Sequence, residues 1–430
     1  MATRANATAG SIDDSEWTLL TGGQVIDGTG ADPDSDSAVL VQGDRIAEVG
    51  PRDELDYPED ETEVVDVGDR TIMPGLIDAH THITIYNHRT RGRFRLIDPR
   101  NTLAYNTIRA TESAEAFIEG GVTTIRECCG RDFISVSVRD AIEEERLHGP
   151  RILPSGPLIT ITAGLDDKRP YFLDRNPANG WEVNGVDEVV QAVREHSKAG
   201  VSNIKLDASG AWTSFTDSKT PTMSERELAA AAEEARKFGI TTACHAHDPV
   251  GIKNAARANV TSIEHGTYLD EEGLEIMLDN DIYLVPTLAS VEYFTEHGDN
   301  FDMNDEQFQS IVDDLEAQKE SVKMAKEAGI KVAVGASSEP PGLPHGSTWR
   351  EMMHFVDLGF SPMEALVAGT QTAAELLGIE NDVGTLEPGK SADVLVVDGD
   401  PLDDIEVFGR EANPALVLKQ GSVAVDNRPA

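Results

Sequence analysis

Short apolar runs alternate along most of the chain with longer stretches in which apolar residues recur at helical spacing. Eight such runs can be counted, at residues 76–79, 122–126, 152–154, 202–207, 241–245, 261–265, 282–286 and 331–335. Helical stretches include residues 224–238, 270–280, 304–328 and 361–377. Alternating strands and helices favour a parallel sheet, and eight units in roughly 300 residues match a closed barrel. The pattern therefore predicts an α/β fold with a TIM-like (β/α)8 barrel.

Both ends of the chain have a different, strand-only pattern. Before residue 75, apolar runs at 19–26, 39–41, 46–49 and 64–67 are separated by turn residues. Strand-like runs return at 393–397, 415–418 and 422–425. Since these late strands are too few for an independent sheet, we expect them to pair with the early ones. We therefore predict a small β-sandwich domain formed by residues 1–74 and 381–430, around a catalytic barrel at residues 75–380.

The charge balance is strongly acidic. Against 36 basic side chains the 430 residues carry 77 acidic ones, a formal net charge of -41, and the acids are spread through the chain. Such a surface repels nucleic acids and anionic membranes, so neither is an expected partner. It resembles proteins from salt-loving cells, in which salt screens carboxylate repulsion, and we hypothesise a halophilic source. A single acidic docking face for a basic partner is the alternative that the dispersion of the acids disfavours.

Cysteine usage and the N-terminus bear on the compartment. The three cysteines are Cys128, Cys129 and Cys244; two are adjacent, so they define no disulfide framework. Residues 1–17 lack the apolar core of a signal peptide, and no apolar run reaches the ~18 residues of a membrane span. We expect a soluble, cytoplasmic protein that acts on a small molecule, and whether it forms a homo-oligomer stays open.

Several of the eleven histidines fall at the ends of predicted barrel strands, where barrel enzymes assemble their active sites. His80 and His82 end the first strand, and period-two alternation directs both side chains to one face. Two imidazoles on one face can share a metal ion. The alternative is a histidine pair exposed on a rim.

Three further residues add to this pattern. Lys205 lies within an apolar strand and alternates with its apolar neighbours, so it is predicted to point into the barrel mouth. A free ammonium there costs desolvation energy, so unless an acid such as Asp207 pairs with it, Lys205 is expected to lose its charge or to be modified. His245 and His265 end the fifth and sixth strands. Together these residues converge as an imidazole-rich metal site requires.

The motifs that contain these residues resemble those of the amidohydrolase superfamily. They are Pro74-Gly75-Leu76-Ile77-Asp78-Ala79-His80-Thr81-His82, Ile204-Lys205, His245-Ala246-His247 and Glu264-His265-Gly266. The segment Val25-Ile26-Asp27-Gly28-Thr29-Gly30 also resembles the strand and turn that open many members. The broader likeness is to imidazolonepropionase-like proteins and to Xaa-Pro or Xaa-Arg type dipeptidases.

The resemblance implies a metal-dependent barrel that hydrolyses an amide C–N bond in a small substrate, such as a dipeptide or an N-acyl amino acid. Carried over to this chain, it implies that His80 and His82 hold one divalent ion, that His245 and His265 hold the other, and that Lys205 bridges them as a carbamate. Zinc is favoured, with manganese, iron and cobalt open. A hydroxide shared by the two ions is the expected nucleophile.

After the eighth strand the sequence departs from the family pattern. The family usually has Gly-Thr-Asp there, with an aspartate that shuttles protons, whereas this chain has Ser337 at that position. A serine cannot act as a carboxylate base near neutral pH. We hypothesise that Glu339 substitutes as proton shuttle, with Glu127 and His345 as alternatives. A catalytically impaired or silent binding protein, and a cyclic amidase or esterase, stay open as alternative functions.

A second departure lies at residues 160–165. The sequence there is Thr-Ile-Thr-Ala-Gly-Leu, where related dipeptidases often have Thr-Gly-Gly-His. The missing histidine leaves the substrate preference open. Residues near strand ends that could line the pocket, or be ordinary loop residues, are Tyr86, His88, Arg89 and Tyr268.

Overall fold

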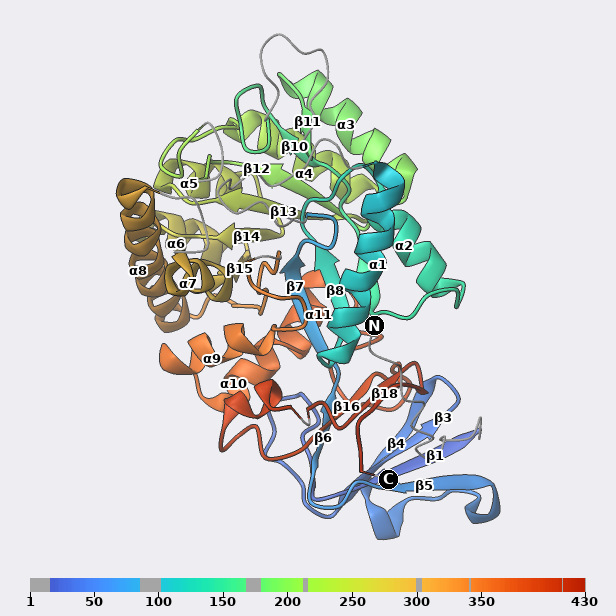
Figure 1. The fold of residues 1–430 in the computed structure, drawn as a ribbon. Coiled ribbons are helices and arrows are strands. Elements are labelled where there is room, and N and C mark those ends of the chain that lie inside the picture. Colours follow the sequence, from blue (N-terminus) through green and yellow to red (C-terminus); the bar gives the residue numbers. More distant parts are fainter. Residues whose placement is uncertain are drawn as a thin grey trace.

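The computed structural model describes residues 16–85, 102–167, 179–211, 216–298, 304–339, 342–411 and 413–429. Figure 1 shows a barrel of strands surrounded by helices and, below it, a smaller β-rich part in which both ends of the chain take part. Tyr86, His88 and Arg89, which the sequence suggested as pocket residues, lie outside the described residues.

The barrel is built from parallel strands. They form two sheets, β7-β8-β9 and β11-β10-β12-β13-β14-β15, and the strand order follows the chain except at β11, which pairs with the outer edge of β10. The barrel prediction is confirmed. The strand bounds are β7 Leu76–Thr81, β8 Val122–Glu127, β9 Arg151–Leu153, β10 Leu158–Thr160, β11 Gly180–Glu182, β12 Asn203–Asp207, β13 Thr241–Ala246, β14 Ser262–His265 and β15 Tyr283–Val285.

One side of the barrel is formed by a strand that bends. β9 pairs with β8, and after the bend β10 pairs with β12. At the bend, the Pro154 carbonyl accepts from the backbone N–H groups of Ser202 and Asn203, at 2.8 and 3.2 Å. These bonds connect the sheet that contains β9 to the sheet that contains β12. The predicted third strand at 152–154 is thus only the first half of the strand found here.

Residues 331–339, which we call the seam, close the barrel between β15 and β7. The seam is extended but forms only an isolated bridge, between Leu284 and Val332, where the sequence pattern predicted a regular strand at 331–335. Backbone hydrogen bonds of 2.9 to 3.0 Å connect it to Leu284 on one side and to Ala79 on the other. The eighth strand position is therefore occupied, although the pairing is too short to count as a strand.

Amphipathic helices cover the barrel. Their starts are set by polar caps: the Ser224 hydroxyl accepts from the Glu227 N–H in a capping box, and Asp248 and Asp270 cap the two following helices. The predicted helix at 361–377 is divided in two at Gly369 and Thr370. The helix bounds are α1 Leu103–Glu119, α2 Ile134–Glu143, α3 Val186–Ala199, α4 Glu225–Lys237, α5 Pro249–Arg257, α6 Glu271–Asp279, α7 Leu288–Glu296, α8 Asp305–Ala328, α9 Trp349–Asp357, α10 Pro362–Ala368 and α11 Gln371–Leu377.

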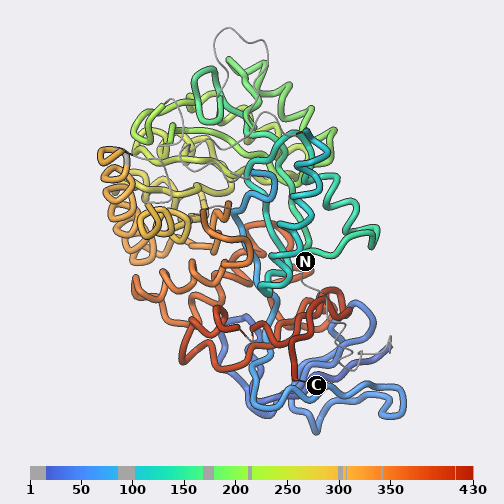
Figure 2. Tube along the Cα trace, viewed as in Figure 1, coloured from blue at the N-terminus to red at the C-terminus, as the bar shows by residue number. Residues whose placement is uncertain are grey.

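The β-rich part consists of two sheets, ordered β4-β3-β1-β5 and β18-β17-β16-β6-β2. β16 pairs with β6, so the two chain ends share one sheet, and Figure 2 shows the blue and red segments side by side. An apolar core that includes Leu20, Val39, Val394 and Leu416 lies between the sheets. The bounds are β1 Trp17–Thr21, β2 Gln24–Val25, β3 Ser37–Gln42, β4 Arg45–Pro51, β5 Thr62–Asp66, β6 Thr71–Pro74, β16 Val394–Val397, β17 Leu416–Lys419 and β18 Ser422–Asp426, with short 3-10 turns at Arg52–Glu54, Glu59–Glu61 and Ile405–Gly409.

Among the described helices, none combines the length and apolar character that crossing a membrane requires.

Candidate metal centre

A pocket opens at the carboxyl ends of the barrel strands. Residues from β7, β10, β12, β13 and β14, from the segments that follow β7, β8 and β10, from α7 and from the seam line it. The side chains that can carry charge or bind metal are His80, His82, Cys128, Cys129, Asp166, Lys205, His245, His247, His265 and Glu339. The apolar and hydroxyl side chains are Ile85, Leu158, Leu165, Ala211, Thr287, Ser290, Val291, Phe294 and Ser337.

The five histidines of the pocket form one cluster. The ring centroid of His80 lies 5.2 Å from that of His82 and 5.1 Å from that of His265. His245 lies 4.5 Å from both His247 and His265. The ligand atoms of His245, His247 and His265 all lie within 4.8 Å of one another. The resemblance implied a ligand role for His245, whereas the geometry brings both His245 and His247 close to His265.

These imidazoles are held in the neutral form that binds metal ions. Burial, with a further contribution from the charge of Lys205, lowers the pKa of His82 to about 4 and that of His247 to about 3. Burial likewise lowers the pKa values of His80, His245 and His265 well below the ordinary value. A neutral imidazole offers a lone pair, so the cluster is ready to coordinate a divalent ion without first losing protons.

Lys205 stands among these histidines on β12. Its side chain is 2% exposed, and among the described residues its Nζ has no hydrogen-bond partner. The alternative partner Asp207 instead accepts from the Thr160 hydroxyl at 2.7 Å and from the Leu165 N–H at 2.8 Å. A buried amine without a partner is costly as an ammonium ion. The neutral imidazoles around this amine provide a donor set that fits a divalent metal ion.

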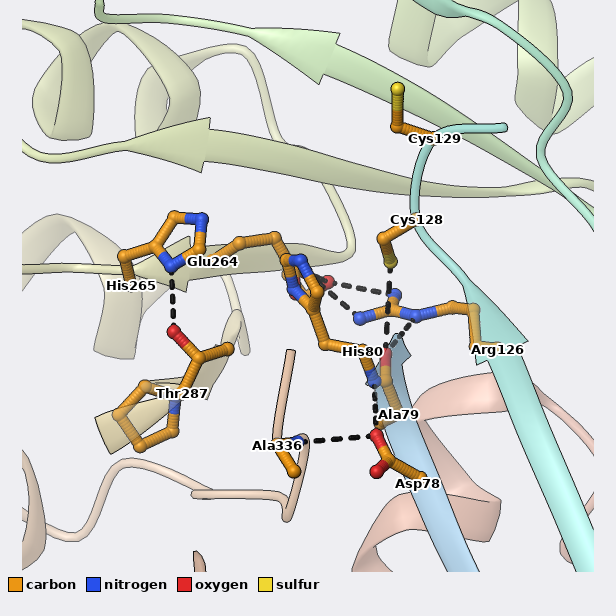
Figure 3. A network of polar contacts seen from close by, with 12 residues as sticks. Asp78, Ala79, His80, Arg126, Cys128, Cys129, Glu264, His265, Thr287 and Ala336 are labelled. Atoms are coloured by element: carbon orange, nitrogen blue, oxygen red, sulfur yellow. Dashed lines mark hydrogen bonds and ion pairs between the residues drawn. The ribbon is translucent and has the colours of Figure 1, made fainter. Parts of the chain in front are cut away.

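A buried network fixes the orientation of His80 (Figure 3). Its Nδ1 lies 2.5 Å from Oε2 of Glu264, and Oε1 of Glu264 accepts from Nη2 of Arg126 at 2.9 Å. Arg126 also donates to the Ser262 hydroxyl at 3.0 Å and to the Ala79 carbonyl at 2.5 Å. Since Nδ1 donates to Glu264, Nε2 of His80 is left to bind a metal ion. We call His80, Glu264, Arg126 and Ser262 the buried network.

Other histidines are oriented in the same way. Nδ1 of His265 bonds to the Thr287 hydroxyl and Nδ1 of His247 to the Thr267 hydroxyl, both at 2.7 Å (Figure 3 shows the former). His265 adopts a positive φ of 71°, which a non-glycine residue rarely does. Such strain is typical of functional sites, where the surrounding structure holds a side chain in place.

The seam places Ser337 at the pocket. Its N–H donates to the His80 carbonyl at 2.7 Å, and its φ of 49° is left-handed. Asp78 ties the seam to β7, because its carboxylate accepts from the N–H groups of Ala336 at 3.2 Å and His80 at 3.1 Å (Figure 3). Burial raises the pKa of Asp78 to about 6. At the position where the resemblance leads us to expect an aspartate, this chain therefore offers only the hydroxyl group of Ser337.

Of the candidate proton shuttles, Glu339 is the one that the structure brings into the pocket. His345 is not among the described lining residues, and its Nε2 lies 3.1 Å from the His82 carbonyl. Glu127 is fully buried beside the pocket and accepts from Thr84 at 3.1 Å, and burial raises its pKa to about 7. Tyr268 also lies outside the lining, because its hydroxyl donates to Asp314 at 2.6 Å.

The sequence analysis missed three residues of this site, Arg126, Asp166 and Glu264. Glu264 was quoted only as part of the motif around His265, although alternation along β14 places it on the same face as Ser262. A charged residue in the middle of a buried strand was the available signal. Asp166 had none, because it lies in a loop between predicted strands.

Comparison with known proteins gives consistent results. A model described as "Amidohydrolase family" matches residues 71–424, and one of an imidazolonepropionase-like composite domain of bacteria matches residues 38–56. Ochratoxinase of Aspergillus niger is 29% identical over 96% of this chain and 88% of that protein. Imidazolonepropionase of Symbiobacterium thermophilum is 24% identical over 90% of each. The crystal structure of a Xaa-Pro dipeptidase with bound methionine in the active site is similar with a TM-score of 0.84 and 30% identity, covering 95% of this chain and 99% of that one.

Proposed function

The chain belongs to the amidohydrolase family and is a hydrolase acting on carbon–nitrogen bonds, and we propose that it cleaves an amide bond of a dipeptide or an N-acyl amino acid at a two-metal centre. The observation that carries the proposal is the convergence of five neutral histidines on the buried amine of Lys205. Neutral imidazoles are ligands for divalent cations, and the Lys205 amine has no hydrogen-bond partner among the described residues.

In this proposal His80 and His82 would hold one divalent ion and His245 and His265 the other. The neutral amine of Lys205 would add carbon dioxide and lose a proton, and the resulting carbamate would supply further ligand oxygens. Zinc suits a ligand set rich in imidazole, and manganese, iron or cobalt could replace it. Two such ions would lower the pKa of water and polarise a substrate carbonyl. Glu264 keeps Nδ1 of His80 occupied, so that the ring presents Nε2 to the pocket.

The lining of the pocket supports a substrate with an apolar group next to the amide. Leu158 and Leu165 line the pocket from β10 and the loop after it, and Val291 and Phe294 line it from α7. Burial of an apolar side chain between such walls contributes about 1.5–3 kcal/mol. Substrates named for the relatives, a Xaa-Pro dipeptide and ochratoxin, suggest the first compounds to assay.

We assign the proton transfer to Glu339. The leaving nitrogen needs a proton, and a carboxyl group within reach of the pocket can supply it. Glu339 follows Ser337 by two residues and lines the same pocket. Ser337 cannot perform this step, since a hydroxyl is not an acid or base near neutral pH.

The metal content per chain tests the proposal without knowledge of the substrate. Elemental mass spectrometry on the purified protein should find about two divalent ions per chain, the number a two-metal site holds. No metal after reconstitution with zinc and bicarbonate would contradict the proposal. A His245→Ala variant should hold less metal than the wild type, which ties the ions to this cluster rather than to the acidic surface.

A second candidate function is a silent binding protein on the same scaffold, and the observation that favours it is the serine at position 337. Ser337→Asp discriminates between the two. A large gain in dipeptide hydrolysis over an inactive wild type would support the silent protein. Loss of an existing activity would support a hydrolase adapted to serine.

We also propose that the protein is halophilic and cytoplasmic. The net charge of -41 and three free, buried cysteines support a salt-rich, reducing compartment. Circular dichroism should show a higher unfolding temperature in molar potassium chloride than at low salt. Full stability at low salt with no gain on salt addition would contradict halophily.

A further inference from the structure

Helix α7 begins directly after Thr287, the residue whose hydroxyl orients His265. Oγ1 of Thr287 lies 2.7 Å from Nδ1 of His265, and both residues line the pocket (Figure 3). Thr287 occupies the N-cap position of α7, but in the described structure its side chain accepts no capping hydrogen bond from that helix. Thr102, at the same position of α1, does cap its helix and accepts from the Tyr105 N–H at 3.2 Å. The Thr287 hydroxyl is thus used for the histidine and not for the helix.

The backbone of Thr287 accounts for this difference. A capping residue ordinarily has an extended backbone, whereas Thr287 is left-handed, with φ 62° and ψ 37°. This region is unfavourable for a β-branched residue, so the surrounding structure must hold Thr287 in place. Gln318 supplies part of that support, because its Nε2 donates to the carbonyl of His265 at 3.1 Å and to that of Pro286. The remaining support has to act on the other side of Thr287, at the start of α7.

Glu351 on α9 supplies the cap that Thr287 does not. Its side chain is fully buried, and its two carboxylate oxygens accept from the N–H groups of Leu288 at 2.9 Å and Ala289 at 2.7 Å. These are the first two N–H groups of α7, which have no partner within the helix itself. A carboxylate is also favourable at the positive end of the helix dipole. Glu351 therefore fixes the first turn of α7, one residue away from Thr287.

The contact between α7 and α9 does not depend on Glu351 alone. One turn later on α9, Nε2 of His354 lies 2.9 Å from Oε2 of Glu292 on α7. Burial lowers the pKa of His354, but the carboxylates of Glu292 and Glu351 outweigh this effect and the net shift is upward. Burial raises the pKa of Glu351 to about 7, so its negative charge is costly at this position. Since a second contact already connects the two helices, packing by itself does not require this buried carboxylate.

We propose that Glu351 is a positioning residue of the metal centre: it caps α7 in place of Thr287, so that the Thr287 hydroxyl stays on Nδ1 of His265 and leaves Nε2 of that ring for a metal ion. The inference rests on the proposed function, because it concerns a side chain that would hold the metal. Glu351 itself lies outside the pocket lining and acts through Thr287. In this arrangement a carboxylate on α9 controls a ligand on β14.

Zinc affinity, measured with the metal alone, tests this role without a substrate. Competition with a fluorescent chelator gives the affinity of the purified, metal-free full-length protein. Glu351→Gln keeps the shape of the side chain and one acceptor oxygen, but its amide NH2 group cannot accept from the helix. The variant should bind zinc about tenfold more weakly, because partners that orient ligands typically contribute roughly 10–100-fold to metal affinity.

A double-mutant cycle separates positioning from a general loss of stability. Thr287→Val removes the hydroxyl that contacts His265 and should weaken zinc binding by a similar factor, and Thr287→Ser should restore it. In the Thr287→Val background Glu351→Gln should have no further effect on zinc affinity, because its route to His265 is already broken. Losses of affinity that add in the double variant would overturn the proposal.

The matched control is Glu292→Gln, which weakens the second contact between α7 and α9 and leaves the first turn of α7 unchanged. It should lower the urea concentration at the unfolding midpoint but keep the zinc affinity of the wild type. An equal loss of zinc affinity in Glu292→Gln and Glu351→Gln would overturn the proposal, because helix packing would then explain both.

The remaining outcomes distinguish this proposal from the proposed function. A wild type that binds no zinc would overturn both. Zinc binding by the wild type, with unchanged affinity in a folded Glu351→Gln protein, would overturn the role of Glu351 alone. If Glu351→Gln does not fold, Thr287→Val decides: weakened binding that Thr287→Ser restores supports the proposal, and unchanged binding contradicts it.

Discussion

Two regions that meet at His80 are built in opposite ways. The buried network holds the side chain of His80 through charged groups that are all at most 1% exposed. The seam approaches the same residue from the other side through main-chain hydrogen bonds, and it forms only an isolated bridge with β15. The hydrogen bonds of the buried network leave each of its side chains little conformational freedom. The seam contributes Ser337, where the sequence departs from the expected aspartate, and Glu339, to which we assign the proton transfer.

The two regions correspond to two tasks in the proposed function, metal binding by the buried network and proton transfer by the seam. Metal ligands need fixed geometry, and a fully satisfied network of charges supplies it. A proton shuttle needs only a carboxyl group within reach, which several positions on an extended segment can provide. The serine at position 337 therefore lies where the structure places fewer demands on the side chain.

Breaking the buried network should have the largest effect. Glu264→Ala leaves the guanidinium of Arg126 buried without its carboxylate, so we expect the free energy of unfolding to fall by about 3–5 kcal/mol. Metal retention should fall as well, because the ring of His80 loses its partner. Urea unfolding and elemental analysis measure the two effects.

A matched control is Glu272→Ala, which removes an exposed carboxylate that pairs with Arg257 at 2.6 Å. Exposed pairs contribute little, so this variant should remain close to the wild type in stability and metal content. Equal losses in the two variants would show that the buried network has no special role.

At the seam, Glu339→Gln should lower kcat by about 100-fold with little change in KM, because general acid–base catalysis contributes at least that much. Stability and metal content should stay the same, in contrast to the Glu264 variant. Steady-state kinetics on a dipeptide measure the effect. Unchanged turnover would transfer the proton step to another group.

The Gly335→Ala variant tests whether the seam, which forms few backbone hydrogen bonds with its neighbours, is also loosely packed against them. A Cβ there would lie 2.5 Å from Cγ1 of Val285 and 2.7 Å from Cβ of His80. Overpacking of this kind costs about 1–3 kcal/mol, which thermal unfolding can resolve. An unchanged unfolding temperature would mean that the seam yields to the added methyl. Gly50→Ala controls for the loss of a glycine, because Gly50 also has no positive φ and its added methyl would lie 3.9 Å from Cδ2 of Leu55, an ordinary contact.

The smallest effect concerns the Thr348 hydroxyl, which donates to Asp78 at 2.7 Å. Burial raises the folded-state pKa of Asp78 to about 6, so its contribution to stability falls as the pH rises from about 4 to 6. Thr348→Val removes a bond that lowers this pKa, so the fall should extend to higher pH. We expect a loss of about 1 kcal/mol at pH 8 and a smaller loss at pH 5, measured by urea unfolding.

Much of the fold could be predicted from periodicity. The barrel strands at β7, β8 and β12 to β15 were long or apolar enough to recognise, and β16 was expected to join the N-terminal strands. β10 was missed because Leu158–Thr160 is short and follows a bend, and β11 has no buried residue to mark it. The run at 331–335 occupies the eighth strand position as expected, but it forms only an isolated bridge. An apolar run does not reveal how many backbone hydrogen bonds the neighbouring strands can offer.

The candidate site was predictable only where side chains stand at strand ends. His80, Lys205 and His265 follow from strand position and motif, and the structure brings them together. Arg126 and Asp166 could not be predicted, because their roles depend on contacts across the barrel or on a loop conformation that sequence spacing does not encode. Glu339 was expected at the pocket, and the structure places it there, but its role in proton transfer stays a prediction.

On the side of the seam, the hydrogen bonds described above use only main-chain groups, at Lys331, Ala333, Val334, Ala336 and Ser337. Main-chain groups are the same for every residue type except proline, so mutation at position 337 can replace an aspartate by a serine without opening the barrel. During evolution, a member of this family can therefore lose or exchange its acid at this position in a single step and remain folded. Such a folded protein can accept new substrates before a second carboxylate, such as that of Glu339, takes over the proton transfer.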